Sequence, residues 1–380
     1  MKIIIVGTAY PLRGGIAHFN GLLAHELEKR HEVSTITFKR QYPKILFPGT
    51  TQDEPGEAPG SAPAPRLIDS INPFNWIGVA KKIRAEKPDL LIFKYWLPFF
   101  GPCFGTIAWL SKRKSKAKVL FICDNIIPHE RRPGDIAFTR YAFRHADYFI
   151  VQSDTVEEQL NRLFPKARYR KAPHPVYENF GSVQPKETAK RSLGMASKHV
   201  MLYFGYIRRY KGLMVLIEAM ARLKSTGFAN GDFLLLIVGE FYDEESKYRD
   251  RVRDLNLESN IRFVSGYLPN EQVGPYFSAA DVVVLPYLSA TQSGIVQIAY
   301  NFDKPVIATR VGGLAEVIVE GKTGYLVPPN NADALADALL KFYTEQREGE
   351  FGANARLEKS KYTWDNLVSS IESMMKDTVK

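Results

Sequence analysis

The sequence has little cysteine and no long apolar run, and both features narrow the class of protein. Its 380 residues contain two cysteines, Cys103 and Cys123, in no metal-ligand spacing. A disulfide-framed secreted protein is therefore disfavoured, and we expect a reducing, cytoplasmic compartment. The longest apolar run, 97–110, has 14 residues and two prolines, whereas a membrane span needs about 20. The four apolar residues at 3–6 are too few for a signal-peptide core and predict a first β-strand.

Several ligand-binding motifs are also absent. The first strand-to-helix loop lacks Gly-x-Gly-x-x-Gly, which disfavours a dinucleotide cofactor. No Walker pattern occurs, which disfavours an ordinary nucleoside triphosphatase. No nucleic-acid recognition motif is present and the basic residues alternate with core strands, so we expect no nucleic-acid partner.

The excess of positive charge lies in one half of the chain. The formal net charge is +10, and residues 1–180 hold 27 Lys and Arg against 17 Asp and Glu. The remaining residues carry as many acidic as basic side chains. The two halves are therefore expected to meet different partners.

Short unbroken apolar runs alternate with helical patterns along the chain. Such runs indicate strands that helices cover on both faces, so we predict an α/β fold of two doubly wound, Rossmann-like domains facing a cleft. The predicted domains are 1–175 and 190–360, followed by a C-terminal helix within 361–380. The predicted strands are 2–6, 33–38, 90–93, 119–123 and 148–151, then 200–204, 233–238, 261–264, 282–285 and 306–309.

Ligands of such folds bind outside the carboxyl ends of the strands, so the loops there are the candidate sites. Gly14 and Gly15 open a helix after the first strand, where backbone N–H groups can approach an anion. The equivalent loop of the second domain, 204–212, carries three cations, which suit a diphosphate. A run of small hydroxyl residues and a glycine at 291–296 leads into another helix.

These motifs resemble those of the retaining family 4 glycosyltransferases of the GT-B fold. The resemblance covers nearly the whole chain and is strongest at 204–212, 266–286, 294–296 and 305–329. It implies a donor site in the second domain and an acceptor site in the first. The implied donor-binding residues are Gly205, Arg208, Lys211, Gly266, Tyr267, Leu268, Thr291, Ser293, Gly294, Ile295, Val296 and Glu316.

The resemblance also implies roles for these residues. Arg208 and Lys211 match the basic pair on the donor diphosphate, the 294–296 backbone matches the phosphate-binding turn, and 266–268 borders the nucleotide base. Glu316 is equally consistent with a helix N-terminal acid. No Asp-x-Asp occurs, which agrees with an enzyme that needs no metal and no cofactor besides its nucleotide-sugar substrate.

Two departures from the family pattern affect the expected chemistry. Placing 294–296 on the phosphate turn puts Thr291 and Ala299 where the family carries two glutamates, and Asp124 where it carries an acceptor-side histidine. Asp124 and His129 are therefore the catalytic candidates, and Gly14 and Gly15 form the expected acceptor-side loop. Either the polar roles have moved, or activity is reduced or lost. The residues that could have taken them over are Gln292, Ser293, Gln297, Asp124 and His129.

We therefore expect transfer of a sugar, with retention, from a UDP- or GDP-type donor to a hydroxyl of a glycan or lipid-linked acceptor in cell-envelope polysaccharide synthesis. Two other classes stay open. The first is a non-catalytic nucleotide-sugar-binding protein of the same fold, which the missing glutamates favour. The second is a GT-B-fold epimerase that acts on the nucleotide sugar alone.

Residues 97–118 suggest a membrane partner. An apolar, aromatic stretch runs into Lys112, Arg113, Lys114, Lys116 and Lys118. This order is typical of a segment that lies on an anionic membrane surface, and predicts peripheral attachment with the apolar part at the headgroup boundary. The alternative is a buried helix whose basic end is solvated.

Overall fold

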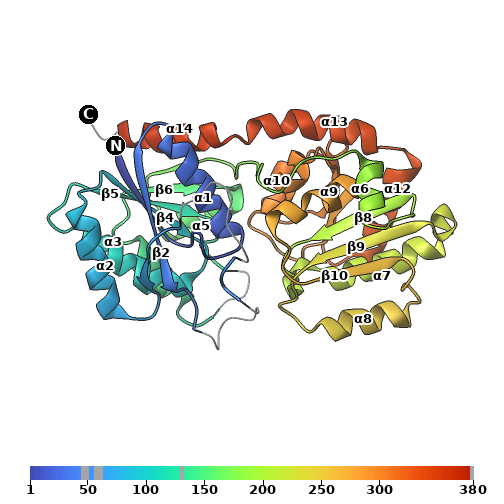
Figure 1. Cartoon of the computed structure of the whole chain (residues 1–380), viewed down its shortest axis with the longest axis horizontal. Helices are drawn as coiled ribbons and strands as arrows, with labels where there is room; N and C mark the ends of the chain where they lie inside the picture. The colour runs from blue at the N-terminus through green and yellow to red at the C-terminus, as the bar shows by residue number, and fades with distance from the viewer. Residues whose placement is uncertain (44–50, 55–62, 129–131, 377–380) are drawn as a thin grey trace. The chain divides into compact units, whose positions relative to one another are not determined.

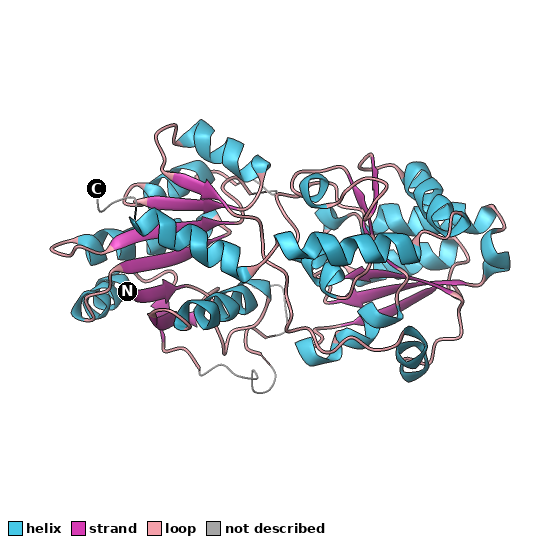
Figure 2. Cartoon of the chain, turned by 90° about the horizontal axis from the view of Figure 1, so that it is seen from above, coloured by secondary structure: helices cyan, strands magenta, loops and turns pink. Residues whose placement is uncertain are grey.

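The computed structural model describes residues 1–43, 51–54, 63–128 and 132–376. It divides into two compact units, Met1–Pro173 with Trp364–Lys380 and His174–Thr363, here called the first and second units. In each unit, helices lie on both faces of a central sheet (Figures 1 and 2). Within the described ranges, no helix combines the length and apolar character needed to cross a membrane.

The first unit is built on a seven-stranded parallel sheet of order β3-β2-β1-β4-β5-β6-β7. Its strands are β1 Lys2–Val6, β2 Glu32–Arg40, β3 Arg66–Asp69, β4 Leu90–Tyr95, β5 Lys118–Cys123, β6 Tyr148–Val151 and β7 Tyr169–Lys171. Its α-helices are α1 Gly15–Glu28, α2 Pro73–Ala85, α3 Gly101–Lys112, α4 Asp135–Phe143, α5 Asp154–Leu163 and α14 Trp364–Lys376. The last helix packs beside α1, where the Trp364 and Phe19 rings lie 5.2 Å apart (Figure 1).

The second unit is built on a six-stranded parallel sheet of order β10-β9-β8-β11-β12-β13. Its strands are β8 His199–Phe204, β9 Phe233–Gly239, β10 Ile261–Ser265, β11 Val282–Leu285, β12 Val306–Thr309 and β13 Gly324–Val327. Its α-helices are α6 Lys186–Ser192, α7 Leu213–Ser225, α8 Glu245–Asp254, α9 Gly274–Ala279, α10 Gly294–Asn301, α11 Leu314–Val317, α12 Ala332–Thr344 and α13 Glu348–Glu358. The predicted fold class, two Rossmann-like α/β domains, is confirmed.

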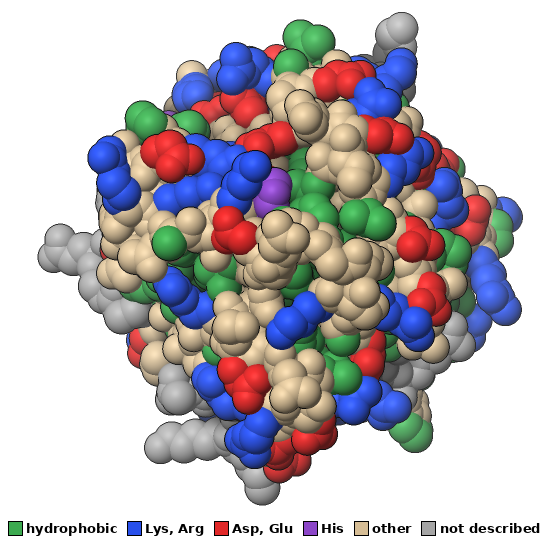
Figure 3. All heavy atoms as spheres, turned by 90° about the vertical axis from the view of Figure 1, so that its right-hand side faces the viewer, with side chains coloured by type: hydrophobic (Ala, Val, Ile, Leu, Met, Phe, Trp, Pro, Cys, Tyr) green, Lys and Arg blue, Asp and Glu red, His purple; other side chains and the backbone are tan. Residues whose placement is uncertain are grey.

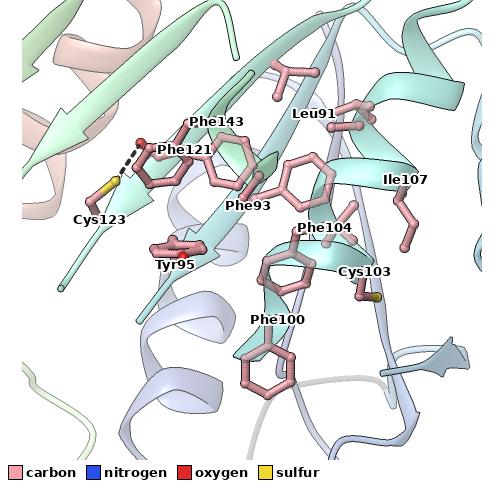
Figure 4. Close-up of a cluster of buried hydrophobic side chains, with 14 of the residues drawn as sticks. Leu91, Phe93, Tyr95, Phe100, Cys103, Phe104, Ile107, Phe121, Cys123 and Phe143 are labelled. Atoms are coloured by element: carbon pink, nitrogen blue, oxygen red, sulfur yellow. Dashed lines mark hydrogen bonds between the residues drawn. The ribbon is translucent and has the colours of Figure 1, made fainter. Parts of the chain in front are cut away.

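Aromatic side chains fill the core of the first unit between its sheet and α3. Phe93 and Phe121 stack with ring centroids 5.0 Å apart, and Phe100 and Phe104 lie against this cluster (Figure 4). Phe100, Phe104 and Ile107 are fully buried. The prediction that the apolar part of 97–118 lies at a membrane boundary is therefore wrong for these three residues, because the sheet already covers them.

Candidate donor site and acceptor-side residues

Two loops of the second unit meet at the carboxyl ends of neighbouring strands. The first loop, 205–212, follows β8, and the second, 286–293, follows β11. The Leu288 backbone N–H donates to the Tyr210 carbonyl at 2.7 Å. Gly212 has φ +69°, and a Cβ there would overlap the Pro286 carbonyl oxygen. The close approach of the two backbones therefore requires glycine at this position.

The Lys211 side chain lies between these two loops. A Cβ on Gly205 would stand 3.2 Å from Lys211 Nζ and 3.4 Å from Ile295 Cδ1, so the ammonium group lies beside the first turn of α10. Its Nζ is also 5.4 Å from the centre of the Tyr287 ring. Burial, with a smaller contribution from Arg208, lowers the Lys211 pKa to about 8. A lysine that is desolvated in this way and lies near a second cation is suited to an anionic ligand.

The Arg208 guanidinium carbon lies 4.9 Å from the centre of the Tyr242 ring, in a cation–π contact. Tyr242 in turn packs on Tyr206, with ring centroids 4.8 Å apart. These tyrosines come from the loops after β9 and β8. The aromatic pair holds one face of the guanidinium and leaves its N–H groups as donors.

The start of α10 is the third part of the candidate donor site. The Ser293 side chain caps this helix by accepting from the Ile295 N–H at 3.3 Å. Gly294 lies against Tyr177, whose ring would be 3.0 Å from a Cβ at that position. The Tyr177 hydroxyl forms a hydrogen bond with His174 Nε2 at 3.2 Å, and both side chains are buried. This pair therefore packs against the turn and supports it. Val296, the third residue of the predicted turn, is buried.

The remaining predicted donor residues lie on other strand ends of the same sheet. Thr291 is buried, and its carbonyl accepts from the Gly313 N–H at 3.2 Å, which ties the second loop to the one that precedes Glu316 in α11. Gly266, Tyr267 and Leu268 follow the edge strand β10, two strands from β8. The Gly266 N–H donates to the Gly239 carbonyl at 3.1 Å, which fixes this segment to the end of β9.

In the first unit, Asp124 follows β5 and is buried in an ion pair. Its Oδ1 lies 2.6 Å from Lys94 Nζ, and Lys94 also donates to Gln152 Oε1 at 2.8 Å. The same ammonium group lies 3.4 Å from the centre of the Phe19 ring. Burial lowers the Lys94 pKa, while the Asp124 carboxylate opposes that shift. The predicted catalytic carboxylate is thus fixed by a cation rather than exposed as a free base.

The other acceptor-side residues lie near the start of α1 or outside the described residues. Gly14 precedes this helix with φ +101°, and a Cβ on Gly15 would meet no atom within 4 Å. His18, in the first turns of α1, has its Nε2 3.9 Å from the Glu54 carboxylate, and burial lowers its pKa to about 4. His129, the second catalytic candidate, lies outside the described residues.

Four residues that the sequence alone did not identify lie beside the predicted site residues or their partners. Two lie at the Asp124 ion pair in the first unit, and two lie at the cationic loop of the second. Lys94 and Gln152 lie within or just after buried strands, where nothing in the sequence marks a polar partner. Tyr242 and Tyr287 each follow a predicted strand end, and that position was the one signal that could have identified them. Among the residues that the structure describes, no cluster of three or more His, Cys, Asp or Glu side chains could hold a metal ion.

Two Rossmann-like units, the second with a cationic loop after β8, are the domain composition of the GT-B fold of glycosyltransferases. Residues 198–345 match the family model "Glycosyl transferases group 1", and residues 13–178 match "Glycosyltransferase Family 4". The two models together cover most of the chain. The chain belongs to this family of glycosyltransferases, as the motifs at 204–212 and 294–296 predicted.

Individual relatives differ in their stated substrates. The chain is 28% identical over 310 residues to a D-inositol 3-phosphate glycosyltransferase of Corynebacterium urealyticum, covering 74% of this chain and 70% of that one. It is 25% identical over 240 residues to a lipopolysaccharide 1,2-N-acetylglucosaminetransferase of Salmonella typhimurium, covering 60% of this chain and 61% of that one. The solved structure of Anabaena HepE with UDP and glucose has a TM-score of 0.76 at 17% identity, over 99% of this chain and 100% of that chain.

Proposed function

We propose that the protein transfers a hexose, with retention, from a nucleoside-diphosphate sugar to a hydroxyl group, and that it does so without a metal ion. The position of Lys211 is the observation that carries this proposal. Its ammonium group lies beside Gly205 and the first turn of α10, and burial, with a smaller contribution from Arg208, lowers its pKa. A diphosphate would supply negative charge beside this desolvated cation.

The acceptor hydroxyl oxygen forms a new bond to the anomeric carbon of the sugar while the bond between that carbon and the diphosphate oxygen breaks. The leaving group is the nucleoside diphosphate, so negative charge develops on it. Lys211 places a point charge and Arg208 a forked set of donors where that charge forms. The N-terminal end of α10 adds positive potential through the helix dipole. Two cations and a helix terminus can supply the charge that a divalent ion supplies in metal-dependent transferases.

We propose the nucleotide of the donor from the ligands of similar solved structures. We propose the acceptor class from the net charge of the first unit. The HepE structure holds UDP and glucose, which supports a UDP-sugar donor here. The two relatives act on an inositol phosphate and on a lipopolysaccharide, by their names. With its basic excess in residues 1–180, the first unit suits an anionic or lipid-linked glycan of the cell envelope, which a cytoplasmic enzyme would meet at the membrane.

Slow hydrolysis of the donor tests this function without knowledge of the acceptor. The full chain is incubated with UDP-glucose, UDP-N-acetylglucosamine or GDP-mannose, and released nucleoside diphosphate is measured with and without excess EDTA. We expect release from at least one donor, at the same rate in EDTA. Loss of release in EDTA with recovery on adding Mg²⁺ would contradict metal independence.

A nucleotide-sugar-binding protein without activity is the second candidate. The positions of the two family glutamates hold Thr291 and Ala299, which are both buried and carry no charge. Such a protein would bind the donor and release no diphosphate, even when lipopolysaccharide or inositol phosphate acceptors are added. Binding by calorimetry together with no release would therefore favour this candidate over the transferase.

A further inference from the structure

Large exposed hydrophobic side chains are concentrated on one part of the first unit. Among the described residues, eleven large hydrophobic side chains are exposed, and seven of them lie between residues 71 and 141. Phe74 is 84% exposed and Ile77 is 54% exposed, although both lie on a helix. The seven are Ile71, Phe74, Ile77, Trp109, Ile136, Phe138 and Tyr141.

Six of these residues lie on three helices that pack side by side, and Ile71 precedes the first of them. Helix α3 packs against both α2 and α4. Gly101 and Gly105 allow the approach of α4, since a Cβ on Gly105 would be 2.7 Å from the Tyr141 ring. Thr106 Oγ1 and the Tyr141 hydroxyl are 2.8 Å apart at the outer edge of this contact. The outward side chains of α2, α3 and α4, here called the α2–α4 face, therefore belong to one helical layer.

A cation lies C-terminal to an exposed apolar residue in or directly after each helix of the layer. In α2, Lys81 follows Ile77 by one helical turn. Beyond α3, the Arg113 guanidinium lies 5.5 Å from the centre of the Trp109 ring. Beyond α4, the exposed Arg144 follows Tyr141 by three residues.

Acidic side chains are nearly absent from these helices. Helices α2 and α3 contain none, and α4 contains only Asp135, whose carboxylate accepts from the Arg132 backbone N–H at 2.7 Å. The second unit differs, because acidic and basic side chains are interspersed over the surface drawn in Figure 3. In α8 they pair within the helix, as Arg249 does with Glu245. The α2–α4 face thus combines exposed aromatic rings with unbalanced positive charge.

We propose that the α2–α4 face docks on the surface of an anionic lipid bilayer. Tryptophan and tyrosine favour the headgroup region, phenylalanine and isoleucine can enter the acyl boundary, and lysine and arginine attract anionic lipids. A nucleic acid or an acidic protein would match the charge but would leave Phe74 and Ile77 without an apolar environment. The proposal adds a partner to the proposed function and holds whether or not the chain catalyses transfer.

Vesicle sedimentation tests this proposal with the full chain. Vesicles of phosphatidylglycerol and phosphatidylcholine are compared with vesicles of phosphatidylcholine alone, at low and at physiological ionic strength. We expect binding to the anionic vesicles only, weakening with salt as the surface potential is screened. Lys81 and Lys82 are both exposed on α2. Lys81→Gln/Lys82→Gln should lower the partition coefficient about 25-fold, because each cation near such a surface contributes about fivefold.

The apolar contribution is tested separately. Phe74→Ser/Ile77→Ser should lower binding to anionic vesicles by about tenfold or more, from the apolar area that leaves the bilayer. The matched control is Val183→Ser/Leu357→Ser, which removes side chains that are 60% and 70% exposed on the second unit. This control should bind vesicles as the unmodified chain does.

Three outcomes would overturn the proposal. The unmodified chain could stay in the supernatant with anionic vesicles at low salt. The Phe74→Ser/Ile77→Ser variant could bind as tightly as the unmodified chain, which would indicate charge alone. The control could lose binding equally, which would place the contact elsewhere. Binding of UDP by the same samples reports on the donor site, so failure of the proposed function is read independently.

Discussion

At the scale of single residues, the first unit contains a buried ion pair between Lys94 and Asp124 on which its stability depends. Both side chains are buried, and their charged atoms are 2.6 Å apart. Lys94→Met should lower the free energy of unfolding by about 3–5 kcal/mol, because it leaves a carboxylate buried without its cation. A urea titration followed by tryptophan fluorescence measures the loss.

The double variant separates a structural role from a catalytic one. Lys94→Met/Asp124→Leu removes both charges and should regain most of the lost stability. If Asp124 also serves the acceptor, this variant should be stable, bind the nucleoside diphosphate normally and transfer sugar slowly. Normal transfer by the stable double variant would show that Asp124 only holds the fold, and unchanged stability of Lys94→Met would contradict the buried pair itself.

The depressed pKa of Lys211 leads to a prediction about pH. In the free protein this pKa is about 8, and a bound diphosphate would raise it. Affinity for UDP should therefore be constant near pH 7 and fall by up to about tenfold per unit as the pH rises above 8. Calorimetry in two buffers of different protonation enthalpy should show proton uptake on binding in that range.

The Lys211→Arg variant is the control for this titration, because arginine keeps its charge throughout the range. Its affinity for UDP should not decline between about pH 7 and 10. If the unmodified chain also shows no decline, Lys211 does not titrate in the donor site.

At the scale of elements, the position of the proposed donor loop, 205–212, depends on the backbone contact between Gly212 and Pro286. Gly212→Ala should abolish tight UDP binding, because the added methyl group would overlap the Pro286 carbonyl oxygen and push the loop away from β11. The control is Gly227→Ala, which has a similar φ of +73° but no atom within 4 Å of the added Cβ. The control should lose about 1–2 kcal/mol of stability at most and keep its affinity for UDP.

Titration of UDP into both variants tests the argument. Equal loss of affinity in the two variants would mean that left-handed backbone strain, and not the contact with Pro286, accounts for the effect.

The strands show why most of the fold could be predicted from sequence. The predicted runs at 148–151, 282–285 and 306–309 coincide with β6, β11 and β12, since buried parallel strands are continuously apolar. Three strands were missed, and β3, β7 and β13 all lie at sheet edges. Edge strands are short and less completely covered, so they lack the long apolar run that identifies the others.

The candidate site was predictable where its residues are contiguous in sequence. Lys211 and Gly294 lie in compact loop motifs. The structure places the Lys211 ammonium group beside Ile295, and Gly294 directly precedes Ile295 in the first turn of α10. The partner of Asp124 was not predictable, because Lys94 lies inside an apolar strand 30 residues earlier in the chain. Only the parallel pairing of β4 with β5 brings the two side chains together.

At the scale of the whole molecule, net charge is divided between the two halves of the chain in the way that the proposed ligands would require. The basic excess lies in residues 1–180, which hold the α2–α4 face, whereas the balanced remainder holds the cationic loop proposed to bind the donor. A protein that binds a small dianionic ligand in one unit needs only a few local cations there. A large anionic surface or glycan needs the broad positive potential of the other unit.

The most direct test of the donor site is calorimetric titration of UDP and GDP into three proteins: the unmodified chain, Lys211→Ala and Lys198→Ala. Lys198 is an exposed lysine of the same unit and serves as the control. We predict that one nucleotide binds the unmodified chain and the control equally. Lys211→Ala should bind it about 10- to 150-fold more weakly, because a charge-assisted hydrogen bond is worth about 1.5–3 kcal/mol. Equal affinity of Lys211→Ala and the unmodified chain would contradict the placement of the donor diphosphate on this loop.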